Sequence, residues 1–246
     1  MRLEIIVFCI LGGYLWGSIS FARILTRLIS PEKNLEEIEL KNPKSGETQK
    51  LKTVGATTAS VVLGPKIGGL IGIIDILKGA LPTLLLRLAF PDQPYFLFVG
   101  TAVVIGHIFP LYFGFKGGGG LSPALGTLLV LDPLGVIISV IMAFIVGIFL
   151  LKNIAFAVMG GPILLIIWIA LRTGNWVNIV FSIIINLLLI VAVLPDISVY
   201  LKAEKSGKSD LSSSMDTIPM GQMMKKMMQR WGLSPDGKEK PHTNEK

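Results

Sequence analysis

Long stretches without a single charged side chain are the feature that most constrains how this chain can fold. The stretches PLGVIISVIMAFIVGIFLL (133–151) and TGNWVNIVFSIIINLLLIVAVLP (173–195) contain no Asp, Glu, Lys or Arg. A helix of about 20 apolar residues crosses the hydrocarbon core of a bilayer. Within lipid, the backbone must satisfy its own hydrogen bonds, which a helix does without a partner. The sequence therefore predicts an all-α, polytopic integral membrane protein.

Seven apolar segments predict about seven transmembrane helices, some of them short or broken. The fourth segment is too short to cross a bilayer without tilting, and the second is too long for one straight span. We expect Gly64-Pro65 and Gly68-Gly69 to break the second into a short helix and a spanning one. The first segment is interpreted as a retained span, because no A-x-A cleavage site follows it. The segments are 3–25, 55–89, 94–114, 121–131, 133–151, 153–172 and 176–200.

The distribution of positive charge predicts the orientation. If the N-terminus lies outside and all seven segments cross, 18 of the 23 Lys and Arg residues fall in the cytoplasmic loops and the tail. Cytoplasmic loops of membrane proteins carry such an excess, so we expect the N-terminus outside and the C-terminus in the cytoplasm. This topology and anionic lipid explain the net charge of +7, which therefore does not indicate nucleic-acid binding.

Two parts are expected along the chain: a membrane-embedded part (1–201) and a cytoplasmic tail (202–246). At about 217–232 of the tail, methionines recur at helical spacing on one face, while Lys225, Lys226 and Arg230 lie on the other. This pattern predicts an amphipathic helix that lies on the membrane surface. Docking to a partner protein through the Met-rich face is the alternative.

Two ionisable residues of opposite charge lie inside the second apolar segment. Asp75 and Lys78, in GIIDILKGALP, are three residues apart and share a helical face. Ionisable residues within a membrane segment are functional candidates. A buried ion pair that only fixes helix packing is an equally open interpretation.

A run of four glycines, Gly117, Gly118, Gly119 and Gly120, follows Lys116 at the predicted cytoplasmic mouth. Consecutive glycines let backbone N–H groups turn toward an anion. Ser122 and Pro123 suit an N-cap and a first helical position, so the next helix should point its positive end at the glycines. Lys116 adds a positive charge. The stretch therefore predicts a phosphate site, with a flexible hinge as the alternative.

A second candidate phosphate site lies in KLKTVGATTAS (50–60). Lys50 and Lys52 precede Gly55, and Thr57 or Thr58 could cap the helix that follows. Two helix N-termini at one mouth could hold two phosphates. Ordinary helix capping beside loop lysines is the alternative interpretation.

His107 is the only histidine outside the tail and precedes Lys116 by about two helical turns. We expect it to act as a general base or to bind a hydroxyl; the alternative is a buried, hydrogen-bonded histidine. The chain has no G-x-S-x-G, no H-E-x-x-H and no Cys/His cluster, so we predict no metal and no cofactor. Position 112 is a tyrosine, which excludes the H-x-x-x-x-D pattern of CoA-dependent acyltransferases.

Four segments together resemble the motifs of bacterial integral-membrane glycerol-3-phosphate acyltransferases that use acyl phosphate, the PlsY family. The family patterns are approximately G-S-I-P-F-G, G-S-G-N-x-G-A-T-N, D-x-L-K-G and G-H-x-F-P-x-Y-x-x-F-K-G-G-K-G-V-A-T. The counterparts, in the same order, are GSISFA (17–22), LKTVGATTA (51–59), DILKG (75–79) and GHIFPLYFGFKGGGGLSP (106–123). The resemblance covers residues 1 to about 200, and the last motif is its most specific part.

The resemblance implies acyl transfer from acyl phosphate to the sn-1 hydroxyl of glycerol 3-phosphate, or of a related polyol phosphate, in a bacterial plasma membrane. The product is lysophosphatidic acid, and no metal, CoA or protein nucleophile takes part. His107 and Lys116 are then the catalytic residues, with Asp75 and Lys78 in support. The residues that bind phosphate are then the glycines, Ser122, the residues around Gly55, and Ser18 of the first motif.

Departures from the family patterns keep a second function open. Gly119 replaces the second lysine of the last motif, and Ser122-Pro123 replaces its small residue and threonine. In the second motif, Leu51, Thr53 and Thr58 replace a serine and two asparagines, and Lys50 and Lys52 could compensate in part. The alternative is a catalytically impaired relative that binds a phosphorylated lipid or partners another membrane enzyme.

Overall fold

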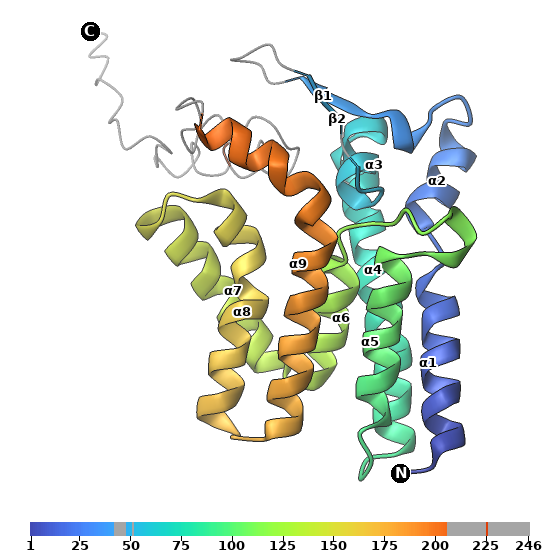
Figure 1. Ribbon diagram of the computed structural model, residues 1–246, viewed down its shortest axis with the longest axis vertical. Coiled ribbons are helices and arrows are strands. Elements are labelled where there is room, and N and C mark those ends of the chain that lie inside the picture. Colours follow the sequence, from blue (N-terminus) through green and yellow to red (C-terminus); the bar gives the residue numbers. More distant parts are fainter. Residues whose placement is uncertain (42–47, 51, 206–224, 226–246) are drawn as a thin grey trace, which may run out of the picture.

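A computed structural model describes residues 1–41, 48–50, 52–205 and 225 of the chain. Within these residues the fold is a bundle of helices that run mostly along its long axis (Figure 1). The predicted amphipathic helix at about 217–232 lies outside the described residues, apart from Lys225.

All seven apolar segments form helices, which confirms the all-α, polytopic membrane prediction. One short antiparallel hairpin is the exception, in which Glu39 of β1 lies opposite Lys50 of β2. The elements are α1 (Leu3–Gly17), α2 (Phe21–Ile29), η1 (Leu35–Glu37), β1 (Glu39–Lys41), β2 (Thr48–Lys50), α3 (Ala56–Leu63), α4 (Pro65–Ala89), α5 (Tyr95–Ile108), η2 (Leu111–Phe113), α6 (Leu121–Leu131), α7 (Pro133–Ile145), η3 (Val146–Leu150, a π-helical turn), α8 (Ile154–Arg172) and α9 (Trp176–Lys205).

Five helical segments in the described part of the chain are long and apolar enough to cross a membrane. Two further apolar helices, Leu121–Leu131 and Phe156–Arg172, are shorter. Large apolar side chains such as Leu85 and Leu88 are exposed on the outer faces, as expected of helices that face lipid. The number of crossings and the orientation stay predictions. The five longer segments are Leu3–Ile29, Pro65–Ala89, Tyr95–Phe113, Pro133–Leu150 and Trp176–Leu194.

The second apolar segment breaks at one of the two predicted glycine sites. Gly64 has a φ of +89°, which separates α3 from α4, and Pro65 opens α4. The predicted break at Gly68-Gly69 is wrong, because α4 continues through both residues. Gly68 lies against Ser60 of α3, where a Cβ would overlap the serine side chain. That glycine therefore allows close packing of the two helices.

The first apolar segment, predicted as one span, is interrupted near Ser18. Helix α1 ends at Gly17, and the Ser20 side chain caps α2 by accepting a hydrogen bond from the Arg23 backbone N–H (3.4 Å). A serine at an N-cap position favours a new helix start over continuation of the old helix. Helix α2 consequently turns away from the line of α1 (Figure 1).

Close helix contacts hold α1 against α5. A Cβ at Gly13 would lie 2.8 Å from the carbonyl oxygen of Val99, and one at Gly17 would overlap the backbone of Val103. On α5, a Cβ at Gly106 would overlap the carbonyl of Tyr14. Small residues let membrane helices approach this closely. The contact fixes the ends of α1 and α5, which carry Ser18 and His107.

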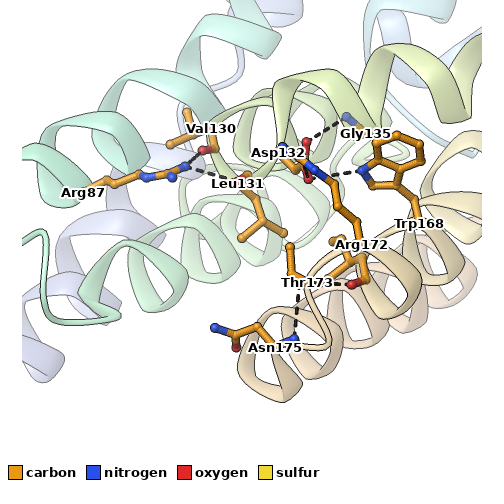
Figure 2. A network of polar contacts seen from close by, with 10 residues as sticks. Arg87, Val130, Leu131, Asp132, Gly135, Trp168, Arg172, Thr173 and Asn175 are labelled. Atoms are coloured by element: carbon orange, nitrogen blue, oxygen red, sulfur yellow. Dashed lines mark hydrogen bonds and ion pairs between the residues drawn. The ribbon is translucent and has the colours of Figure 1, made fainter.

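A polar network at the junction of α6 and α7 ties these helices to α8 (Figure 2). The Asp132 carboxylate accepts hydrogen bonds from Gly135 N–H (2.8 Å), Trp168 Nε1 (3.2 Å) and Arg172 Nη1 (2.6 Å). Burial alone would raise the pKa of Asp132, but these three donors together hold that pKa below its usual value. Nearby, Arg87 donates to the carbonyls of Val130 and Leu131.

Candidate functional site

Segments that are distant in the sequence meet at the end of the bundle opposite the N-terminus. There the connection between α5 and α6 lies close to α2 and α3, below the β1–β2 hairpin (Figure 1). This connection contains η2 and then residues 114–120, which are called the glycine loop below. All four segments that resemble family motifs contribute residues to this region.

The glycine loop folds back onto the end of α5. The Gly118 N–H donates to the carbonyl of His107 (3.1 Å), and the carbonyl of Gly117 accepts from Val54 N–H (2.8 Å). The second bond joins the loop to the segment that precedes α3. Phe115 has a φ of +61°, a conformation that is rare for a bulky residue and is concentrated at functional sites.

Helix α6 begins beside the loop, although not with the predicted cap. Its N-cap is Gly120, whose φ of +76° favours glycine, and Ser122 and Pro123 lie within the first turn. The predicted Ser122 cap is therefore wrong. A Cβ at Gly72 would lie 3.9 Å from Ser122 Oγ, which places this hydroxyl near α4.

Helix α3 also begins beside the loop, with Gly55 as its N-cap. Thr58 is buried and donates to the carbonyl of Thr53 (2.6 Å), while Thr57 is exposed, so the predicted threonine cap is wrong. A Cβ at Gly55 would lie 3.6 Å from the Cα of Gly118. The two predicted phosphate segments therefore meet at Gly55 and Gly118.

Beneath the glycine loop, three ionisable side chains form one buried cluster. Lys78 Nζ lies 3.3 Å from Asp75 Oδ1 and 2.9 Å from His107 Nδ1. It also donates to the carbonyls of Gly17 (3.1 Å) and Ile19 (2.9 Å), at the break between α1 and α2. Lys78 thus joins α4 to α5 and to the first motif. The sequence pairs Asp75 with Lys78, but only the tertiary structure adds His107.

Two side chains approach the same nitrogen of the His107 ring: Lys78 Nζ lies 2.9 Å from Nδ1, and Asp75 Oδ1 lies 3.7 Å from it. An ammonium group has three donors and no acceptor, and Lys78 Nζ lies within 3.3 Å of four possible partners: the two carbonyls, Asp75 Oδ1 and His107 Nδ1. When Lys78 donates to Nδ1, the neutral imidazole carries its proton on Nε2. A Cβ at Gly118 would overlap Nε2, so this nitrogen faces the glycine loop. In that tautomer His107 donates a hydrogen bond toward the loop, which suits the predicted hydroxyl-binding role; with the proton on Nδ1, Nε2 would instead accept, which suits the predicted general-base role.

Lys116 projects from the glycine loop, and its side chain is 70% exposed. Its Nζ lies 3.8 Å from Glu36 Oε2, and its carbonyl accepts from Arg23 Nη2 (2.7 Å). Arg23 and Glu36 are absent from the residues that the sequence predicts for the site. The sequence does hold one signal for Arg23, because it directly follows the GSISFA segment.

The remaining predicted residues lie at different depths. Ser18 is buried and lies against the start of η2, where it donates to the carbonyl of Tyr14 (2.8 Å) and accepts from Leu111 N–H (3.2 Å). Gly119 has no atom within 4 Å of a Cβ built on it, so it faces open space. Lys52 is exposed. Lys50 lies in β2, with its side chain outside the described part.

Among the described residues, no three His, Cys, Asp or Glu side chains lie close enough together to hold a metal ion. The chemistry that this arrangement offers is that of anions and hydrogen bonds. Two helix N-termini, a glycine backbone, a lysine and a histidine N–H all favour negative charge.

Comparison with known proteins places this geometry in a family context. Residues 7–203 match the family model for glycerol-3-phosphate acyltransferase. The glycerol-3-phosphate acyltransferase of Aquifex aeolicus is 36% identical over 148 residues, which cover 60% of this chain and 69% of that protein. The Myxococcus xanthus glycerol-3-phosphate acyltransferase is 40% identical over 125 residues, which cover 50% of this chain and 59% of that protein.

The same likeness extends to solved structures. The crystal structure of PlsY (YgiH), an integral membrane glycerol 3-phosphate acyltransferase, in its glycerol 3-phosphate form superposes with a TM-score of 0.65 at 29% identity, covering 83% of this chain and 94% of that one. The lysophosphatidic acid form gives a TM-score of 0.63 at 30% identity, covering 83% and 93%. The likeness therefore includes the arrangement of the helices as well as the motifs.

Proposed function

Because this chain belongs to the glycerol-3-phosphate acyltransferase family, we propose that it transfers a fatty acyl group from acyl phosphate to glycerol 3-phosphate, or to a related polyol phosphate. The products are lysophosphatidic acid and inorganic phosphate, and the reaction takes place at the cytoplasmic face of a bacterial plasma membrane. The lysophosphatidic acid then enters the surrounding membrane lipid.

One observation carries this proposal: His107 Nε2 faces a glycine loop that lies between two helix N-termini. The N–H groups of the glycine run other than that of Gly118, the N-termini of α3 and α6, and Lys116 are suited to bind phosphate oxygens. Two phosphorylated substrates held side by side would bring a hydroxyl to an acyl carbonyl. Positioning of this kind can supply about 7–11 kcal/mol of a reaction barrier.

The reaction needs no covalent intermediate with the protein. The hydroxyl oxygen of the acceptor attacks the acyl carbon, the bond from that carbon to the phosphate oxygen breaks, and the proton goes to the departing phosphate. His107 Nε2–H donates to oxygen at the reacting centre, where charge develops. Lys78 contacts His107 Nδ1 and is itself paired with Asp75, so these two side chains hold the imidazole in position.

The test is an assay of purified protein reconstituted in lipid, supplied with acyl phosphate and glycerol 3-phosphate. We expect lysophosphatidic acid and inorganic phosphate in equal amounts. His107→Ala and Lys116→Ala should each lose most of the activity, by about 100-fold or more, because each removes a group that stabilises the transition state. Lys66→Ala removes an exposed lysine at the start of α4 and is the matched control.

A folded protein that forms no product with glycerol 3-phosphate or other polyol phosphates would refute the enzyme proposal. It would favour the alternative of a relative that binds a phosphorylated lipid or partners another enzyme. Full activity in both alanine variants would refute the site instead.

A further inference from the structure

Two positive side chains and one carboxylate meet at the edge of the glycine loop, and they come from three separate elements. Arg23 Nη2 on α2 lies 3.1 Å from Oε1 of Glu36 on η1. The other oxygen of that carboxylate, Oε2, lies 3.8 Å from Lys116 Nζ on the loop. Glu36 therefore bridges the two cations.

Arg23 is held rigidly in this group. Its side chain is only 7% exposed, Nη2 also donates to the carbonyl of Lys116 (2.7 Å), and the guanidinium lies 4.6 Å from the centre of the Phe113 ring. Glu36 differs, because its side chain is 41% exposed and it sits on a three-residue helical turn. The carboxylate is therefore more accessible to solvent and makes fewer contacts than the guanidinium.

The hydrogen bonds of Arg23 are incomplete. Its second terminal nitrogen, Nη1, is buried and has no hydrogen-bond partner among the residues that the structure describes. Thr26 Oγ1, three residues later on α2, is buried and unpartnered in the same way. Buried polar atoms of native proteins nearly always have partners, so each exception calls for an explanation. An anion with more acceptor oxygens than a carboxylate would provide the missing hydrogen-bond partner for Arg23 Nη1.

We propose that Arg23 and Lys116 form a clamp for the phosphate group of a substrate, and that Glu36 occupies this clamp and competes with the phosphate. The clamp carries two positive charges, and Glu36 neutralises one of them. A phosphate monoester offers more charge and more oxygens to the same pair. Arginine binds phosphate in a fixed fork geometry, which lysine lacks. In this clamp, Arg23 provides a second positive side chain beside Lys116.

This inference rests on the proposed function in taking the anion to be a substrate phosphate, which either acyl phosphate or glycerol 3-phosphate could supply. Glu36→Gln removes the competing charge and leaves the shape of the side chain. We expect it to bind inorganic phosphate and glycerol 3-phosphate about tenfold more tightly in calorimetry, which corresponds to about 1.4 kcal/mol. Glu32→Gln, at an exposed glutamate four positions earlier in the chain, should change neither affinity.

Steady-state kinetics identify the source of the phosphate. A lower KM for glycerol 3-phosphate alone assigns the clamp to the acceptor, and a lower KM for acyl phosphate alone assigns it to the donor. Arg23→Gln should weaken phosphate binding by about tenfold or more. In the Arg23→Gln, Glu36→Gln double variant the gain from Glu36→Gln should vanish. If Arg23→Gln does not fold, Arg23→Lys takes its place.

Three results distinguish a phosphate clamp from a purely structural ion pair, and distinguish failure of the clamp from failure of the proposed function. If the contacts of Glu36 with Arg23 and Lys116 are only structural, Glu36→Gln should lower the unfolding temperature without raising phosphate affinity. That result would overturn the clamp. Absence of phosphate binding in both wild type and Glu36→Gln would overturn it too. Tighter phosphate binding by Glu36→Gln in a protein without turnover would support the clamp while the proposed reaction fails.

Discussion

At position 118, the absence of a side chain allows His107 to face the glycine loop. A Cβ there would overlap His107 Nε2, whereas one at Gly119 meets no atom within 4 Å. We expect Gly118→Ala to lower kcat/KM by about 100-fold, because a small displacement of a catalytic group has an effect of that size. Gly119→Ala is the matched variant, and its loss should be much smaller.

Steady-state kinetics with both substrates measure this difference, and the unfolding temperature shows whether either variant is destabilised. Equal losses in the two variants would mean that the loop backbone, and not the approach of His107, limits the reaction. The comparison works because both glycines belong to the same run of four.

Within the pair of α1 and α5, glycines set the distance between the helices. A Cβ at Gly17 would overlap the backbone of Val103, while Gly12 on the same helix has no atom within 4 Å. Gly17→Ala should destabilise the protein by about 1–3 kcal/mol through overpacking. Gly12→Ala should be neutral or stabilising by about 0.5–1 kcal/mol, because alanine is the better helix former.

Thermal unfolding in detergent measures both changes. Since α1 ends beside the Lys78 and His107 cluster, Gly17→Ala should also lower activity. A Gly17→Ala protein as stable as Gly12→Ala would contradict the close packing of α1 on α5.

Across the whole molecule, the Asp132 network joins α6 and α7 to α8, far from the site along the bundle. The folded protein holds the pKa of Asp132 below its usual value, so the unfolded chain binds its proton more readily. The resulting stability is complete above the unfolded pKa of about 4. It is lost as the pH falls through the lower folded value.

We therefore expect the unfolding temperature to fall below about pH 4. Asp132→Asn lacks this ionisation, so its unfolding temperature should be lower at neutral pH and should depend less on pH in the acid range. Unfolding scans of both proteins across pH 3–7 test the prediction. Parallel pH profiles would show that other carboxylates govern acid stability.

Much of the architecture follows from the sequence because lipid imposes a simple rule. Uncharged runs such as 133–151 must form helices to satisfy their backbone, and all seven predicted segments are helical. The Gly64-Pro65 break also follows from local chemistry, because glycine adopts a positive φ without a steric cost and proline suits the first position of a helix. Local patterns were less successful at helix starts, where Gly55 and Gly120 are the caps instead of Thr57, Thr58 or Ser122.

By itself, the sequence determined the membrane class, the helical segments and the segments that supply the candidate site, because these depend on composition and local pattern. Only the tertiary structure decided that His107 contacts Lys78, 29 positions away, and that Arg23 contacts the carbonyl of Lys116, 93 positions away. Such contacts depend on how the helices pack, through surfaces as small as Gly17 against Val103. No local pattern encodes that packing, since it requires both partners to be in place.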